Sequence, residues 1–134
     1  MEVQPEPLRG GALLAAISEE IVRLMREHYG RGPTRAKTYV MDDVVVVLLR
    51  NGFTAMEKTM MAGGRAEGVV VMRHDFQTMM AAQYKAVIER LTGSKVTAFL
   101  SQAHVEPDIT LEVFILETGV PGFGVAAEMV PGDV

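Results

Sequence analysis

The feature that most constrains this fold is an uninterrupted run of six aliphatic residues, Val44 to Leu49. A strand with one face in water alternates apolar and polar residues, whereas this run is apolar on both faces and predicts a central strand covered on both sides. The preceding residues 34–41 alternate with a period of two, as an edge strand does. Asp42 and Asp43 between them predict a tight turn. We therefore expect an antiparallel hairpin whose inner strand takes its second cover from a helix or from another subunit.

Three segments show helical spacing. Apolar residues from Ile17 to Met25 recur at intervals of three or four, and the pattern stops at the glycines and proline of residues 30–33. Thr54 and Glu57 form a capping box, so a short helix begins there. A longer stripe from about residue 65 to residue 92 predicts a helix of roughly 40 Å. The members of this stripe are Val69, Met72, Phe76, Met80, Tyr84, Val87 and Leu91.

Two further strands are predicted at residues 95–101 and 109–117, joined by a loop that carries His104, Pro107 and Asp108. The element order is then α-β-β-α-α-β-β. Because each pair of strands has a connection of hairpin length, we predict an α+β fold of two layers. One layer is a four-stranded, mainly antiparallel sheet, and the other consists of helices on one face of it.

The composition fits one folded domain. The chain has 134 residues, of which 49% are hydrophobic and 22% charged, so it has enough apolar material for a core without disulfides. Prolines and glycines predict a flexible arm at residues 1–12 and a flexible tail at residues 119–134, around a domain at residues 13–118. The high apolar content also suggests surplus apolar surface that a second copy covers, so we expect a homodimer.

Several classes of function are excluded or disfavoured. The chain has no cysteine, which excludes disulfides, thiolate nucleophiles and cysteine-ligated zinc or iron–sulfur sites. A net charge of −4 argues against broad binding of nucleic acids. The apolar run Ala12 to Ile17 is too short for a signal peptide or a membrane span, so we place the protein in the cytoplasm and expect no direct insertion into membranes.

The acidic residues of the two predicted turns allow two interpretations. Asp42 and Asp43 would form an oxygen-rich cation site with His104, Glu106 and Asp108 if both turns lay at the same end of the sheet. The alternative is solvated turns, in which aspartate bonds nearby backbone N–H groups. The three histidines show no helical pairing at a spacing of four, so we predict no metal site and no cofactor.

The basic residues also allow two interpretations. Arg31 and Lys37 follow glycines after a helix, which suggests capture of a phosphate or carboxylate, although the order of elements is not that of a P-loop. The alternative is a helix end followed by an exposed edge strand. Arg65 and Arg73 lie near the start of the third helix, where a cation opposes the helix dipole unless an anion or carboxylate answers it. Otherwise they are ordinary exposed residues.

The methionines provide a further candidate surface. Methionine side chains adapt to many partners, but a methionine stripe at helical spacing also occurs in cores. The serines show no nucleophile-elbow pattern, and we identify no catalytic residue. The methionines concerned are Met56, Met60, Met61, Met72, Met79 and Met80.

The segment from Ser18 to Glu117 resembles the bacterial MpsC family, formerly a domain of unknown function and named after a Na⁺-translocating membrane-potential-generating system. The resemblance implies a soluble accessory component connected to a membrane cation or bicarbonate system, and it supplies no catalytic residues. The residues that carry it include Ile21-Val22-Arg23, His28-Tyr29-Gly30-Arg31-Gly32-Pro33-Thr34, Tyr39-Val40-Met41-Asp42-Asp43, Thr54-Ala55-Met56-Glu57-Lys58, Gly64-Arg65, Arg73, Phe76 and Thr92-Gly93-Ser94-Lys95-Val96.

Two hypotheses of function follow. The first is a non-enzymatic accessory or regulatory protein that contacts a partner or a small anion; by the resemblance, a membrane protein is a candidate partner. The second is a domain that binds a small anion or a cation, or an enzyme that acts on such a ligand. The candidate binding residues are Arg31, Lys37, Asp42, Asp43, Arg65, Arg73, His104 and Asp108.

Overall fold

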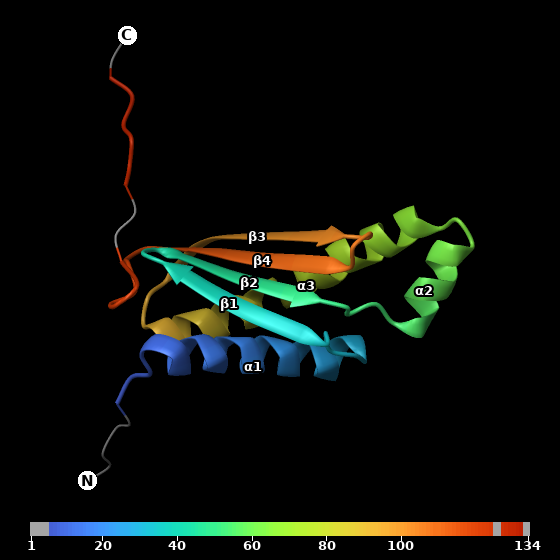
Figure 1. Ribbon diagram of the computed structural model, residues 1–134, viewed down its shortest axis with the longest axis horizontal. Coiled ribbons are helices and arrows are strands. Elements are labelled where there is room, and N and C mark those ends of the chain that lie inside the picture. The colour runs from blue at the N-terminus through green and yellow to red at the C-terminus, as the bar shows by residue number, and fades with distance from the viewer. Residues whose placement is uncertain (1–5, 125–126, 133–134) are drawn as a thin grey trace.

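The computed structural model describes residues 6–124 and 127–132, which form three helices and one four-stranded antiparallel sheet (Figure 1). The element order agrees with the predicted one, and the predicted α+β fold is confirmed. The helices are α1 (Gly10–Tyr29), α2 (Ala55–Ala62) and α3 (Ala66–Thr92), and the strands are β1 (Arg35–Met41), β2 (Val44–Arg50), β3 (Val96–His104) and β4 (Ile109–Leu116).

The strand order is β1-β2-β4-β3, so the aliphatic run in β2 occupies a central position as predicted. Val46 lies between Tyr39 of β1 and Val113 of β4. Asp42 in the β1–β2 turn has a φ of 55°, a left-handed conformation that aspartate adopts more readily than most residues. β3 continues to His104, three residues beyond the predicted end, because its pairing with β4 persists to Ile109.

Helices α1 and α3 cover one face of the sheet (Figure 1). That face of β2 contributes Val45, Val47 and Leu49, all buried. Phe114 of β4 stacks on Phe99 of β3 with ring centroids 5.0 Å apart. The core therefore lies between the sheet and these two helices. Its helical side consists mainly of Leu13, Ile17, Ile21, Leu24, Met25, Met80, Tyr84, Val87 and Ile88.

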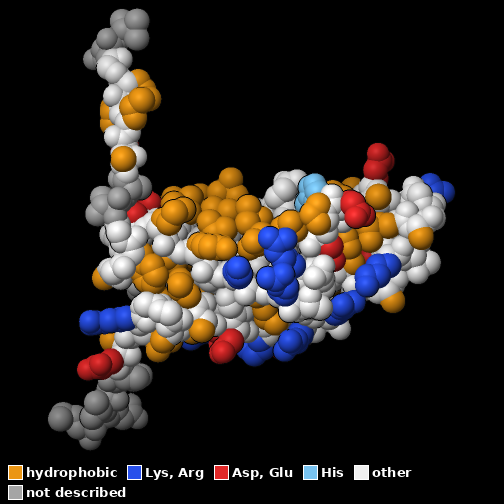
Figure 2. Space-filling view, in the orientation of Figure 1, with side chains coloured by type: hydrophobic (Ala, Val, Ile, Leu, Met, Phe, Trp, Pro, Cys, Tyr) orange, Lys and Arg blue, Asp and Glu red, His pale blue; other side chains and the backbone are white. Residues whose placement is uncertain are grey.

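The opposite face of the sheet has no cover from any described residue, although the sequence predicts a cover on both sides of β2. We call its apolar part the open face. Figure 2 shows hydrophobic side chains gathered over the strands, with Lys and Arg side chains beside them. By strand alternation and register, the open face consists of Tyr39, Met41, Val44, Val46, Leu48, Leu100, Leu111, Val113 and Ile115.

The buried side of α3 differs from the predicted stripe. Arg73 and Gln77 are buried, whereas Met72 and Phe76 are only partly buried. The reason lies in the length of the helix: α3 has 27 residues, so its first half extends past the end of the sheet, where it packs against α2 (Figure 1). There the buried residue of α2 is Glu57, and the paired Arg73 takes the place of an apolar side chain on α3.

The described chain departs from the predicted domain limits at both ends. α1 begins at Gly10, three residues before the predicted start of the domain. After β4, Val120 is buried in the core, and its backbone N–H donates to the carbonyl of Asp42 at 2.8 Å. Phe123 packs partly against the same core. Residues 119–124 therefore hold the β1–β2 turn.

The core makes a direct prediction about stability. Replacing fully buried Ile88 with alanine leaves a cavity between α3 and the sheet, and we expect a loss of about 2–5 kcal/mol in the free energy of unfolding. Gln83→Ala on the exposed side of the same helix is the control, with an expected change within about 0.5 kcal/mol. Urea unfolding followed by circular dichroism measures both, and equal losses would contradict this packing.

Candidate functional site

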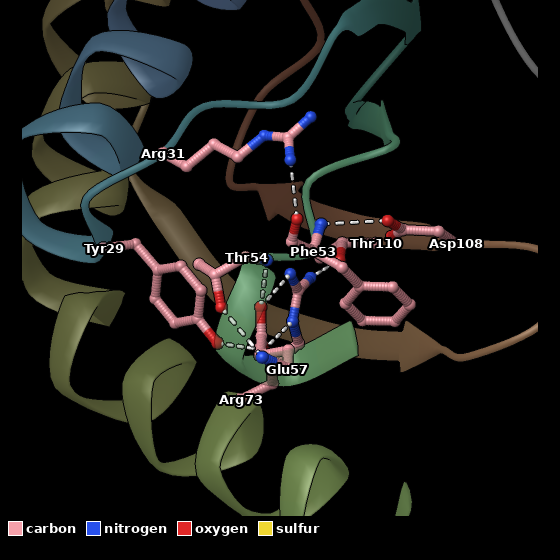
Figure 3. Close-up of polar contacts among 8 residues, drawn as sticks. All are labelled: Tyr29, Arg31, Phe53, Thr54, Glu57, Arg73, Asp108 and Thr110. Carbon is pink, nitrogen blue, oxygen red and sulfur yellow. Dashed lines mark hydrogen bonds and ion pairs between the residues drawn. The ribbon is translucent and has the colours of Figure 1, made fainter. Parts of the chain in front are cut away.

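A network of polar side chains lies where the three helices meet the sheet, and its centre is a buried ion pair between Glu57 of α2 and Arg73 of α3 (Figure 3). Arg73 Nε donates to Glu57 Oε2 at 2.8 Å, and one terminal nitrogen donates to Oε1 at 3.1 Å. Both side chains are almost completely inaccessible to solvent. This two-point geometry is the strongest that an arginine and a carboxylate form, and it joins the two helices.

Glu57 reaches this position because of the capping box that begins α2. Thr54 Oγ1 accepts from the Glu57 backbone N–H at 3.1 Å, and Glu57 Oε1 accepts from the Thr54 N–H at 2.8 Å. The predicted capping box is therefore confirmed. The hydroxyl of Tyr29, the last residue of α1, donates to Glu57 Oε2. One carboxylate thus connects the C-terminus of α1, the first turn of α2 and the first third of α3.

Arg73 is enclosed on its other sides as well. A terminal nitrogen donates to Thr110 Oγ1 of β4 at 3.0 Å, so the guanidinium also contacts the sheet. Its carbon atom Cζ lies 4.4 Å from the ring centre of Phe53 and 5.2 Å from that of Tyr29. Both rings offer their faces to the cation, an attraction that gains strength away from water.

Glu57 and Arg73 each favour the charged form of the other. Burial by itself raises the pKa of Glu57, but hydrogen bonds from Arg73 and Tyr29 outweigh it and hold that pKa below its ordinary value. Burial likewise lowers the pKa of Arg73, and Glu57 more than restores it. The pKa of the Tyr29 hydroxyl is raised, first by burial and then by its bond to Glu57. Both members of the ion pair therefore stay charged at neutral pH.

Three of the predicted site residues meet around this cluster: Arg31, Arg73 and Asp108 (Figure 3). Arg31 donates to the carbonyl of Phe53 at 2.9 Å, and Asp108 Oδ2 accepts from the Phe53 N–H at 2.9 Å. These two side chains fix the segment that leads from β2 into α2. Arg73 finds its carboxylate in Glu57, as the burial of its charge requires. It lies beyond the first turn of α3, where the helix dipole acts.

The other predicted site residues lie apart from the cluster. Lys37 is exposed on the outer side of β1, and Arg65 is exposed at the N-cap of α3. His104 contacts the Pro107 carbonyl at 2.8 Å through Nδ1. Asp42 and Asp43 lie at the end of the sheet near Ile115, whereas the turn with His104 and Asp108 lies at the end near Ile109. The condition for the acidic cation site is therefore not met.

A second buried carboxyl lies on the inner side of β4. Glu112 is buried, and among the described residues its Oε2 atom has no hydrogen-bond partner. Burial raises its pKa to about 8, so it carries a proton at neutral pH. It borders a cavity of about 10 Å³, shared with Arg73, Gln77 and Tyr84, which is about the space that one water molecule needs.

A surface groove adjoins the cluster. It encloses about 340 Å³ where the C-terminus of α1, the start of α2 and the side of α3 meet. Tyr29 and Phe76 meet at its base, edge to face, with ring centres 4.5 Å apart. Met56, Met72 and Met79 line it, and Met56 and Met79 are 61% and 78% exposed. The rest of the lining is polar and consists of His28, Thr54 and Asp75. We call this the methionine groove. Of the predicted methionine cluster, Met80 lies in the core instead.

Sequence reasoning missed three features: the hydroxyl of Tyr29 and the pairing of Glu57 in the buried network, and the inward position of Glu112 near it. A signal existed for two of them. Glu57 and Arg73 are charged residues on helical segments that pack together, and Glu112 shares its side of β4 with Phe114 and Leu116. Only the sheet topology identifies that side of β4 as the inner one.

What the cluster does chemically is limited by its own bonds. Both carboxylate oxygens of Glu57 are occupied, and the guanidinium of Arg73 is shared between a carboxylate, a hydroxyl and two rings. Within the described residues, no group of three histidine, aspartate or glutamate side chains is arranged to hold a metal ion. The ion pair thus connects helices to sheet, and its charged atoms are engaged within the protein.

Comparison with known families settles where the chain belongs. The model of the family described as MpsC, Na⁺-translocating membrane potential-generating system, matches residues 10–118. The chain belongs to the MpsC family. The match spans every helix and strand of the fold. Membership of the MpsC family suggests a link to a Na⁺-translocating system that generates a membrane potential. Neither curated proteins nor solved structures gave a match.

The link to a membrane system does not rest on a spanning segment in the described part of the chain. None of the three helices there combines the length and the apolar character that crossing a bilayer requires.

The ion pair predicts a strong non-additive effect on stability. We expect Arg73→Met and Glu57→Gln each to lower the free energy of unfolding by about 3–5 kcal/mol, because each leaves a buried charge without its partner. The double variant should lose less than the sum, by about 1–3 kcal/mol. Urea unfolding of the four proteins measures the coupling.

The control for this cycle is Arg65→Met, which removes an exposed cation from the start of the same helix. We expect a change within about 0.5 kcal/mol. Strict additivity of the two buried substitutions would show that the contact contributes nothing of its own.

Glu112 predicts a decline of stability with rising pH. Its pKa is raised from 4.5 to about 8 by folding, so between these values the folded state keeps a proton that the unfolded chain has lost. Each pH unit in that window lowers the free energy of unfolding by at most about 1.4 kcal/mol. Glu112→Gln should flatten the decline, which unfolding curves at pH 6 and pH 8 measure. An unchanged slope would mean that Glu112 is ionised in the folded protein.

Proposed function

We propose that this protein is a non-enzymatic accessory component that binds an apolar segment of a protein partner in the methionine groove. The partner is a component of the sodium-dependent system to which the family description refers. A cytoplasmic location is part of the proposal and agrees with a chain that has no cysteine.

The observation that carries the proposal is the exposure of the methionines around a preformed aromatic base. Unbranched, polarisable side chains repack around different apolar partners, which suits a surface that receives a helix or peptide. The groove is shallow, and a volume of about 340 Å³ accommodates a few apolar side chains. The ion pair keeps the three helix segments that form the groove in a fixed relation.

The polar cluster supports a binding role rather than catalysis. Its cation and carboxylate satisfy each other inside the protein, and Arg31 is bonded to the backbone of the same cluster. An anion in this place would have to displace Glu57 from two hydrogen bonds. The groove, in contrast, offers surface without requiring any such rearrangement.

The test replaces two groove methionines in cells. In a strain that lacks the chromosomal copy of the gene, the wild-type gene should restore the Na⁺-dependent membrane potential, read with a potential-sensitive dye. A gene with Met56→Glu and Met79→Glu should fail to restore it, because two carboxylates in the groove oppose an apolar partner. Both sites are exposed, so the protein should fold as before.

The matched control is Met129→Glu, at a methionine that is 82% exposed and outside the groove. It should restore the potential fully. Full restoration by the groove variant would overturn the role of the groove. A deletion strain with an unchanged Na⁺-dependent potential would overturn the link to the system itself.

A further inference from the structure

We propose that the open face of the sheet is the interface of a homodimer, in which two copies of this chain pack sheet against sheet. The proposal begins with the uncovered side of β2. Val44, Val46 and Leu48 lie on it, opposite the buried Val45, Val47 and Leu49. In an ordinary two-layer fold the outer side of a central strand is polar, because it faces water.

β4 gives the strongest evidence, because its polar residues lie on the side that faces the helices and its outer side is apolar, the reverse of the usual arrangement. The side that faces the helices contains Thr110 and Glu112, whereas the outer side is entirely aliphatic. Burying the outer side against another surface would remove from water the more apolar of the two sides. The outer residues are Ile109, Leu111, Val113 and Ile115.

Charge on this side of the sheet is confined to one corner. Arg35 of β1 is paired in register with Arg50 of β2, and Lys37 lies two residues along the strand. The middle of the open face has no charged side chain among the described residues. Cations at a corner keep their charged ends in water while their stems cover apolar surface, so this corner fits the rim of an interface.

The dimensions of the face fit a dimer. Four strands of about seven residues cover about 19 Å by about 23 Å at standard spacings, or roughly 440 Å² in projection. Two copies together would bury roughly 900 Å² of surface in projection, without counting the additional area of side chains that stand out from the sheet. Those side chains add to this area, which compares with the minimum of about 1,000 Å² for a biological interface and about 1,200 Å² for stable, specific ones.

A second copy suits this face better than a different occupant because the face is apolar at its centre and matches itself under a two-fold rotation. A two-fold axis near Val46 and Val113, parallel or perpendicular to the strands, places apolar centre on apolar centre. Either axis carries the basic corner to another corner of the partner's sheet. The cations of the two copies therefore do not meet, and sheet-on-sheet packing covers both runs of valine at once.

Sedimentation equilibrium tests the proposal on the full chain. The wild-type protein should sediment with twice the mass of the chain, and Leu100→Lys should sediment as a monomer with an unchanged circular dichroism spectrum. Leu100 is 56% exposed on the open face, so a lysine there is tolerated by the single chain and opposed by the dimer. The control Val71→Lys, at an exposed site on α3, should remain a dimer.

A thiol label locates the interface without relying on Leu100→Lys. Because the chain has no cysteine, Val46→Cys introduces a single thiol on the open face. Its reaction with a maleimide should slow at least tenfold in concentrated samples relative to dilute ones, whereas the thiol of Val71→Cys should react at the same rate in both.

Three results would overturn the proposal. The first is a wild-type monomer at every concentration. The second is a dimer in which the thiol at position 46 stays reactive, which would place the contact elsewhere, for example at an edge strand. The third is a monomer whose thiol is protected only by phosphatidylglycerol vesicles, which would assign the face to a lipid surface. None of them affects the methionine groove, which lies on the helices.

Discussion

The bidentate bond between Glu57 and Arg73 is the interaction on which the rest of the helical layer depends. α2 packs chiefly on α3, beyond the end of the sheet, so it has little apolar burial of its own. The carboxylate anchors it to α3, the Tyr29 hydroxyl adds α1, and Thr110 adds β4. The attraction within a buried ion pair is largely offset by the cost of removing both charges from water. Separating the two partners inside the protein is costly, because it leaves each charge buried and unpaired. That cost favours one arrangement of the helices.

Two surfaces of different character follow from this arrangement. The methionine groove exists because α1, α2 and α3 are held together at one corner, and its walls are flexible side chains on a rigid base. The open face exists because both helices that contact the sheet lie on the other side of it, and it is broad and rich in branched aliphatic residues. A deformable groove suits a partner of different sequence, and a broad apolar sheet face suits its own copy.

The sequence predicted the secondary structure well because glycines, a capping box and strand alternation are local signals. The order of elements, the central place of residues 44–49 and the cap at Thr54 all follow from neighbours within a few positions. The cluster was predicted only in part. Arg73 was recognised as a cation in need of a carboxylate, but Glu57 is distant in sequence, and only the packing of two helices identifies it. Glu112 was missed because an aliphatic side normally faces inward, and here it faces outward.

The strand order has a consequence for how the chain folds during its synthesis. β4 is the last strand to be synthesised, yet it lies in the middle of the sheet, between β2 and β3. The first hairpin cannot join β3 until β4 has left the ribosome, and the buried Val120 comes later still. The sheet is therefore completed late, through the pairing of β2 with β4, which is distant in sequence. Until then the valines of β2 lack β4 as a neighbour, and a partly assembled chain with exposed apolar strand residues is prone to aggregation.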